Sequence, residues 1–144
     1  EFVVRSMHNT FVNQVDMELK RAERYSVFVS VVVLDLSFLD SFPEHQNEDT
    51  IKEIIDKIRK SVRIMDYVSL LKDNKIGLLL PETPRQGAEI AGRRISEMIK
   101  EYIVNKEKVS LERMVPFKMA SYPDAAGTVS ITDFLKNYTI YSQN

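Results

Sequence analysis

The fold is decided by the stretch Arg63-Ile-Met-Asp-Tyr-Val-Ser-Leu-Leu-Lys-Asp-Asn-Lys-Ile-Gly-Leu-Leu-Leu-Pro-Glu-Thr83. It contains two apolar runs, Tyr67–Leu71 and Ile76–Leu80, separated by the polar step Lys72-Asp73-Asn74-Lys75. Apolar runs of this length around an Asp-Asn step are typical of a β-hairpin. Pro81 cannot donate to a strand ladder, so we expect the second strand to stop there.

Two helices and a strand are expected before this hairpin. Apolar residues at helical spacing predict an amphipathic helix that ends before Tyr25, with Phe11, Val15, Leu19 and Ala22 on one face. The β-branched run Val27–Leu36 is typical of a central strand buried on both faces. The polar segment Ser41–Glu48 predicts a loop. A second amphipathic helix follows it, with the stripe Ile51, Ile54, Ile55, Ile58 and Val62.

The chain after the hairpin predicts a helix, a strand and a helix. The first helix is expected from about Pro84 to Val104, the strand at Leu111–Tyr122, and the last helix from Asp133 to about Ser142. The order of elements favours an α/β (α+β) fold, in which helices flank a central, mostly antiparallel sheet.

Composition limits the classes of function. A chain of 144 residues fits one domain, and a net charge of −1 favours neither a nucleic acid polymer nor a membrane surface as partner. The absence of cysteine excludes disulfides and thiolate metal sites. The only histidines, His8 and His45, lack the spacing of metal ligands, so we expect no zinc site. No apolar run reaches the length of a membrane span.

Five segments, in their order and spacing, resemble the GGDEF family, the bacterial diguanylate cyclase domains that make cyclic di-GMP. They are Glu18–Tyr25, Val32–Leu36, Leu79–Thr83, Ala88–Ile95 and Ala120–Pro123. The resemblance implies a nucleotidyl-cyclase-like sheet and a single GGDEF-like domain over residues 1–144, with its first helix over residues 1–25. The abrupt start at Glu1-Phe2, inside a polar helical pattern, suggests a fragment of a longer multidomain protein, and we expect a cytoplasmic location. Any membrane contact would come from segments outside this chain.

The family signature is replaced in this chain. By resemblance it falls on Lys72-Asp73-Asn74-Lys75-Ile76, where no letter of GGDEF is kept. The first acidic letter, a metal ligand in the family, is Asn74, and the second is Lys75. Magnesium at a triphosphate needs anionic oxygens, and Asp35 alone remains. We therefore expect a degenerate domain, a pseudoenzyme with no catalytic residues, no metal and no cofactor.

A second family motif is kept. The family's product-binding motif RxxD matches Arg63-Ile64-Met65-Asp66, and Arg94 matches a second arginine in the helix after the signature. Arginine pairs bidentately with guanine, and two arginines neutralise two phosphates. The resemblance implies a cyclic di-GMP receptor that uses Arg63, Asp66 and Arg94. We expect it to relay occupancy to a neighbouring domain or protein partner, with a ligand-linked homodimer.

Other interpretations stay open from the sequence. Arg63 and Asp66 are three residues apart, so they also fit a plain surface ion pair, and Arg94 fits the solvated face of a helix. The domain would then be a ligand-free interaction or dimerisation module. GTP binding without turnover and residual cyclase activity are two further alternatives, against which Asn74 and Lys75 argue.

Overall fold

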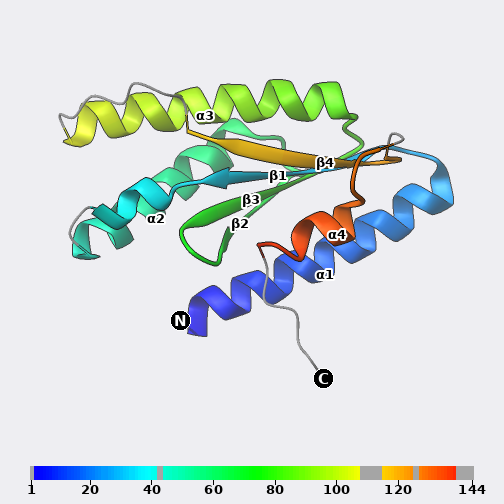
Figure 1. Ribbon diagram of the computed structural model, residues 1–144, viewed down its shortest axis with the longest axis horizontal. Helices are drawn as coiled ribbons and strands as arrows, with labels where there is room; N and C mark the ends of the chain where they lie inside the picture. Colours follow the sequence, from blue (N-terminus) through cyan, green and yellow to red (C-terminus); the bar gives the residue numbers. More distant parts are fainter. Residues whose placement is uncertain (1, 42–43, 108–114, 125–126, 139–144) are drawn as a thin grey trace.

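The computed structural model of the chain describes residues 2–41, 44–107, 115–124 and 127–138. These residues form a four-stranded sheet with helices on both faces (Figure 1). The helices are α1 (Phe2–Tyr25), α2 (Glu44–Ser61), α3 (Arg85–Glu107) and α4 (Ile131–Leu135), with a short 3-10 helix η1 (Ser37–Ser41). The strands are β1 (Val29–Asp35), β2 (Tyr67–Leu71), β3 (Lys75–Pro81) and β4 (Phe117–Tyr122).

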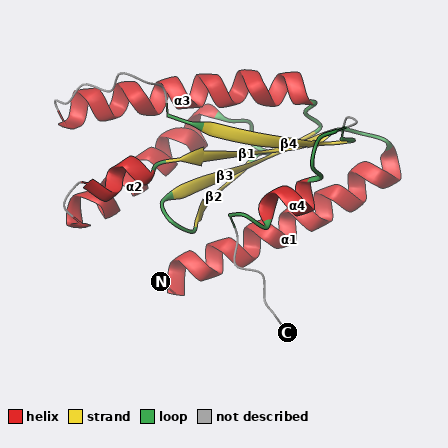
Figure 2. Cartoon of the chain, in the orientation of Figure 1, coloured by secondary structure: helices red, strands yellow, loops and turns green. Residues whose placement is uncertain are grey.

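The sheet has the strand order β2-β3-β1-β4, and each neighbouring pair is antiparallel. The expected mixed α/β fold with an antiparallel sheet is therefore confirmed. Figure 2 shows α2 and α3 on one side of the strands and α1 and α4 on the other. The two edges of the sheet are β2 and β4.

The strand β1 has a core on each face, as its unbroken apolar run predicts. Val32 and Leu34 pack with the stripe of α2 and with Ile95 and Ile99 of α3. Val31 and Val33 pack in a second cluster with Phe11, Val15 and Ala22 of α1 and Ile131, Phe134 and Leu135 of α4. The alternation of side chains along a strand divides one run between two cores.

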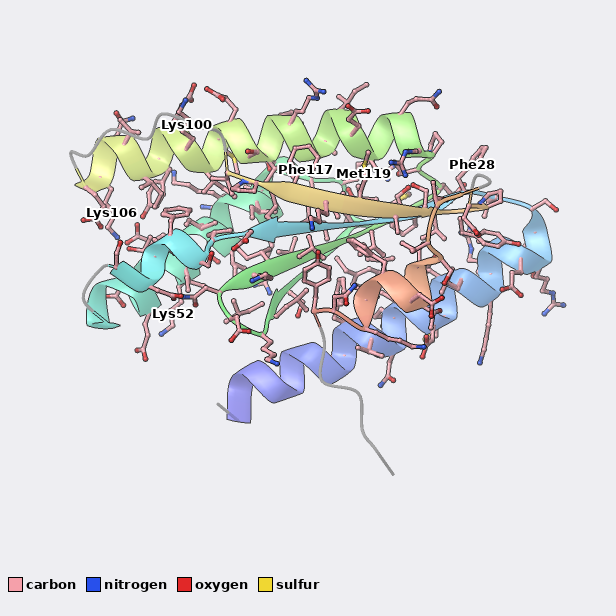
Figure 3. All side chains as sticks on the ribbon, in the orientation of Figure 1. Phe28, Lys52, Lys100, Lys106, Phe117 and Met119 are labelled. Carbon is pink, nitrogen blue, oxygen red and sulfur yellow. The ribbon has the colours of Figure 1, made fainter. Side chains whose placement is uncertain are left out.

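A close contact between α3 and β4 fixes the position of α3. Phe117 and Met119 lie between β4 and α3 and pack against the core on that face (Figure 3). Gly92 of α3 faces the Phe117 ring so closely that a Cβ atom there would lie 2.5 Å from a ring carbon. The absence of a side chain at Gly92 therefore sets how near α3 comes to the sheet.

Several expected boundaries in the first half of the chain are wrong: α1 includes Tyr25, and β1 ends at Asp35 rather than Leu36. The strand predicted from Val27 begins at Val29, because Ser26 has a left-handed φ of 56° and the Val27 N–H donates to the Ala22 carbonyl at 3.2 Å. This hydrogen bond closes the end of α1 in the Schellman pattern. The segment Ser41–Glu48 is not all loop, because α2 already begins at Glu44. Its first residues are polar and carry no apolar stripe that a periodicity argument could detect.

In the second half, β3 stops at Pro81, as expected, whereas other ends differ. The helix α3 continues to Glu107 instead of ending at Val104, and β4 begins at Phe117. The expected start of the latter strand, Leu111, lies outside the described residues. The helix α4 begins at Ile131, two residues before the predicted Asp133, because the Ser130 side chain accepts from the Asp133 N–H as an N-cap. It also ends early, at Leu135 with Lys136 as its C-cap, so the prediction that this helix continues to about Ser142 is wrong at residues 136–138. No helix in the described ranges has the length and apolar character that crossing a bilayer requires.

Candidate functional site

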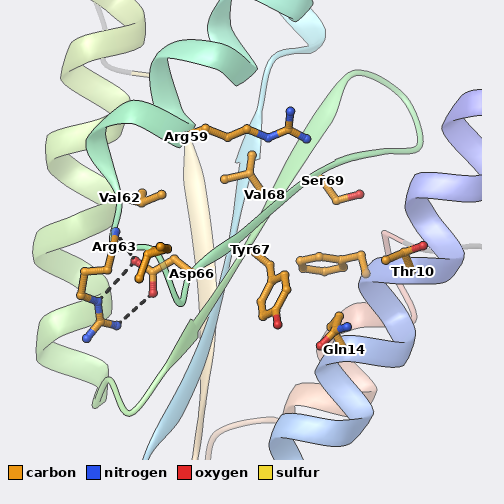
Figure 4. Close-up of a pocket in the computed structure, with 11 residues that line it drawn as sticks. Thr10, Gln14, Arg59, Val62, Arg63, Asp66, Tyr67, Val68 and Ser69 are labelled. Atoms are coloured by element: carbon orange, nitrogen blue, oxygen red, sulfur yellow. Dashed lines mark hydrogen bonds and ion pairs between the residues drawn. The ribbon is translucent and has the colours of Figure 1, made fainter.

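Arg63 and Asp66 form one compact turn between α2 and β2. The Arg63 backbone N–H donates to Asp66 Oδ2 at 2.9 Å, and Arg63 Nη2 donates to Asp66 Oδ1 at 3.0 Å (Figure 4). The Asp66 N–H donates back to the Arg63 carbonyl at 3.0 Å. The Asp66 side chain is only 4% exposed, whereas that of Arg63 is 50% exposed. The carboxylate is thus used to hold the guanidinium, one face of which is open to solvent.

The same guanidinium also holds the link between β3 and α3. Arg63 Nη2 donates to the Pro81 carbonyl at 2.9 Å and to Thr83 Oγ1. Thr83 is fixed in turn, because its hydroxyl donates to the Pro81 carbonyl at 2.9 Å and its own carbonyl accepts from Ser30 Oγ at 2.7 Å. Sequence reasoning did not assign Thr83 a role. Its separation of 20 residues from Arg63 gives no local signal.

Arg94 approaches the turn from α3. Its Nη1 donates to the carbonyl of Ser61, the last residue of α2, at 3.1 Å. The last carbonyls of a helix lack intrahelical partners and carry partial negative charge, so a cation there is favourable. Ser61 precedes Arg63 by two residues. Within the described ranges, Arg94 makes no hydrogen bond or ion pair with Arg63 or Asp66. Two of the predicted residues are therefore paired directly, and the third lies at the adjacent turn.

The turn between β2 and β3 contains two residues in the left-handed backbone conformation that usually favours glycine, although neither is glycine. Asp73 and Asn74 both have left-handed φ values, 59° and 55°. Asp and Asn tolerate this region better than other side chains do. Asn74 Nδ2 donates to Asp40 Oδ1 at 2.7 Å, and the Asn74 carbonyl accepts from the Leu36 N–H at 3.0 Å. These bonds tie the turn to the end of β1 and to η1.

Asp35 forms an ion pair with Lys75 of the same chain. Lys75 Nζ lies 3.7 Å from Asp35 Oδ1, and the Ser37 N–H donates to the same oxygen at 2.9 Å. Partial burial acts to raise the pKa of Asp35, but the hydrogen bonds from Ser37 and the charge of Lys75 outweigh it, and the pKa lies below its ordinary value. Among the described residues, no group of three or more His, Cys, Asp or Glu side chains gathers in one place.

A cleft of about 500 Å³ opens beside the Arg63 turn, between α1, the end of α2 and the edge strand β2. Figure 4 shows Arg59 and Val62 on the α2 side of β2, and Thr10 and Gln14 on the α1 side. The other lining residues are Phe11, Arg63, Ile64, Asp66, Tyr67, Val68 and Ser69. The sequence did not predict this cleft, because it depends on which strand forms the edge of the sheet.

Comparisons with known proteins agree with this fold. The profile of the family described as diguanylate cyclase, GGDEF domain, matches residues 7–130. A sequence search of curated proteins finds no match. Among solved structures, the active GGEEF domain of a diguanylate cyclase from Vibrio cholerae is 13% identical with a TM-score of 0.57. That comparison covers 81% of this chain and 75% of the Vibrio chain.

Two further solved structures are similar to the same degree. The GGDEF domain of DgcB from Caulobacter crescentus, solved in complex with c-di-GMP, is 14% identical with a TM-score of 0.61 over 79% of this chain and 71% of that chain. The GGDEF domain of YfiN from Pseudomonas aeruginosa is 19% identical with a TM-score of 0.59 over 80% and 74%. At these identities the likeness shows the shared fold.

Proposed function

This chain belongs to the GGDEF domain family, and we propose that it is a non-catalytic member that binds cyclic di-GMP through Arg63, Asp66 and Arg94. The observation that carries the proposal is the Arg63 side chain, which is fixed by Asp66 and yet half exposed. A cation held in one rotamer loses little entropy on binding, which is the advantage of a preorganised site. The DgcB domain, solved with c-di-GMP, supports testing this ligand first.

Each residue has a distinct part in the proposed site. Arg63 Nη1 makes no hydrogen bond within the described ranges, so it and the exposed guanidinium face are free for the edge and ring of a guanine. Asp66 positions Arg63 rather than contacting the base, because its carboxylate is 4% exposed. Arg94 adds a positive charge that no carboxylate among the described residues neutralises. A phosphate group would accept from it in place of the Ser61 carbonyl.

The proposal includes loss of cyclase activity. The family reaction uses divalent cations at its signature, and the donor set of this chain does not fit them. The signature turn supplies an amide at Asn74 and an ammonium at Lys75, and Asp35 is matched by Lys75. A magnesium ion bound beside that ammonium would meet like-charge repulsion and have too few anionic ligands. We therefore expect no cyclase reaction at this turn.

Occupancy of the site would be transmitted through the elements that it joins. Arg63 links the end of α2 to the β3–α3 connection, and Arg94 links α3 to the end of α2. A ligand that contacts both arginines favours one arrangement of these three segments, which a neighbouring domain or partner can sense. A cyclic dinucleotide carries two bases and two phosphates, so it can also bridge two copies of the domain.

Isothermal titration calorimetry with cyclic di-GMP, and with GTP and magnesium in parallel, tests the proposal. We expect saturable heat with cyclic di-GMP alone. Arg63→Ala should abolish that heat, whereas the control Arg93→Ala should retain it, because Arg93 only pairs with the exposed Glu89. Circular dichroism shows that each variant is folded. Unchanged binding by Arg63→Ala, or no heat from the folded parent domain, would refute the proposal.

A second candidate function is a protein interaction module that binds no nucleotide. The observation that favours it is the exposure of apolar side chains beside the edge strand. Ile64 is fully exposed, and Met65 and Tyr67 are also exposed. This function predicts no thermal stabilisation by cyclic di-GMP, because a ligand that does not bind the native state cannot raise its melting temperature.

A further inference from the structure

The outer edge of β2 presents backbone groups that pair with no other strand in the described part of the chain. The Asp35 N–H donates toward β4, to Pro116, and the Leu36 N–H donates toward β3, to Asn74. Along an antiparallel ladder, the backbone N–H and C=O groups of successive residues point alternately to the two neighbouring strands. The backbone groups of even-numbered β1 residues therefore bond to β3, and those of odd-numbered β3 residues bond to β2. The bonded pairs of the hairpin are therefore Tyr67–Leu79, Ser69–Gly77 and Leu71–Lys75. The N–H and C=O groups of Val68 and Leu70 point outward, away from the sheet. The Leu70 carbonyl accepts from Ser69 Oγ at 3.3 Å, which leaves its second lone pair for a further donor.

A groove surrounds these backbone groups. Its floor is β2, and its walls are α1, with Thr10 and Gln14, and the end of α2, with Arg59 and Val62 (Figure 4). Its volume of about 500 Å³ is space for a short extended segment beside the strand. The strand also lacks the lysine or proline by which proteins commonly block an exposed edge, because its sequence is Tyr-Val-Ser-Leu-Leu.

The groove carries one positive charge that its own residues do not neutralise. Two arginines line it, and Arg63 is paired with Asp66. Arg59 is exposed and makes no hydrogen bond or ion pair within the described parts of the chain. The remaining lining side chains are apolar or uncharged. A complementary occupant therefore needs a carboxylate at Arg59 and apolar or small side chains elsewhere.

We propose that this groove binds an extended acidic peptide segment of a partner protein, which adds to the sheet as a fifth strand beside β2. Its backbone pairs with Val68 and Leu70, and a carboxylate side chain pairs with Arg59. Main-chain bonds supply affinity in this mode of recognition, and alternate side chains supply specificity. A second copy of β2 fits less well, because its adjoining carboxylate, Asp66, is already held by Arg63. Arg63 also lines the groove, but the peptide contacts are assigned to Arg59, Val68 and Leu70, and the ligand contacts to Arg63 and Arg94.

Peptide display tests the proposal. A random seven-residue phage library is selected on the purified domain, and enriched peptides are synthesised with a fluorescent label for anisotropy titrations. We expect the enriched sequences to share an aspartate or glutamate. Arg59→Glu should weaken them at least about tenfold, because it replaces attraction by repulsion. Lys60→Glu is the control, and it should bind the peptides as the parent does. It makes the same change of charge next to Arg59, but Lys60 does not line the groove.

A second pair of variants tests the backbone contact. Val68→Pro removes the outward N–H while leaving the bonds of Tyr67 and Ser69 to β3, and it should weaken the peptides at least about tenfold. Val68→Ala shortens the side chain, keeps the N–H and should bind within a few-fold of the parent. Melting curves establish that each variant is folded. Cyclic di-GMP titrations of Val68→Pro should match the parent, so failure here and failure of the receptor proposal are distinguishable.

Three outcomes would overturn the proposal. One is that no peptide is enriched, and another is that enriched peptides bind Val68→Pro as well as the parent. The third is a parent domain that sediments as a dimer and a Val68→Pro variant that sediments as a monomer, which would assign the edge to a second copy of this chain.

Discussion

The ammonium group of Lys75 and the carboxylate of Asp35 face each other across β1 and β3 at a distance of 3.7 Å. The pair lies where the signature turn joins the sheet, beside the bond between Asn74 and Asp40. The chain therefore carries its own cation next to the carboxylate of Asp35. The turn is held by contacts within the protein, and two consequences can be measured.

The first consequence is a pH dependence of stability. Because the pKa of Asp35 is lower in the folded state, its contribution is full above the unfolded pKa of about 3.9 and is lost as the pH falls through the lower folded pKa. We expect Asp35→Asn to melt below the parent at neutral pH, and this difference to shrink below about pH 4. The effect is at most about 1 kcal/mol, because the carboxylate is about one-third exposed and solvent screens it.

Thermal melts of both proteins between neutral pH and about pH 3 measure this difference. Asp56→Asn is the control, since Asp56 is an exposed carboxylate without a hydrogen bond or ion pair among the described residues. A gap between the parent and Asp35→Asn that widens on acidification would contradict the assigned direction.

The second consequence concerns metal ions. Lys75→Glu would place two carboxylates opposite each other on adjacent strands, which costs up to about 1 kcal/mol. We expect this variant to melt lower than the parent in chelator and to recover when manganese is added, because a divalent cation would replace the lost ammonium. The parent and the control Lys72→Glu, changed at an exposed residue of the same turn, should not respond. A Lys75→Glu variant whose melting temperature ignores manganese would show that the two carboxylates do not form a cation site.

The fold was predictable where burial leaves a periodic pattern. The apolar run of β1 and the apolar stripes of α1 and α2 predict that these helices pack on the sheet, because a core on each face of the sheet requires apolar residues on both sides of β1. The ends of elements were predicted poorly. Polar residues give the same pattern in a loop and in the first turn of α2, and the ends of α1 and α4 depend on caps at Ser26 and Ser130.

In the candidate site, the contact between residues close in sequence was predictable, and the contacts between residues far apart in sequence were not. The three-residue spacing of Arg63 and Asp66 predicts that they can pair, and they do. Their contacts with Thr83 and the position of Arg94 at Ser61 depend on how α3 packs on the sheet. No spacing within the sequence encodes those distances. The ligand role of these residues stays a prediction.

Arg94 provides a test of the ligand site against an adjacent matched residue. Arg94→Ala should weaken cyclic di-GMP binding at least about tenfold, because it removes a positive charge from the site that binds this doubly negative ligand. Its stability should fall by only about 0.3–1 kcal/mol, the value of an exposed cation at a helix end. Arg93→Ala loses an exposed pair with Glu89 and should bind normally. Calorimetry and thermal melts measure the two effects, and equal affinities of the two variants would remove Arg94 from the site.

The approach of α3 to β4 also controls the position of Arg94. Gly92→Ala would place a Cβ atom 2.5 Å from the Phe117 ring, so α3 or the ring must move. Overpacking of this kind costs about 1–3 kcal/mol, more than the gain of about 1 kcal/mol from replacing glycine by alanine in a helix. We expect a net loss of stability in denaturant unfolding.

The companion variant Phe117→Leu separates steric overlap from other causes of that loss. It removes the clashing ring atoms, so Gly92→Ala should cost less in the Phe117→Leu background than in the parent, with a coupling of about 1 kcal/mol. Arg94 follows Gly92 by two residues, so the overpacked single variant should also bind cyclic di-GMP more weakly, and the double variant should regain part of that affinity. Additive losses in the double variant would mean that contact with Phe117 does not set the distance between α3 and the sheet.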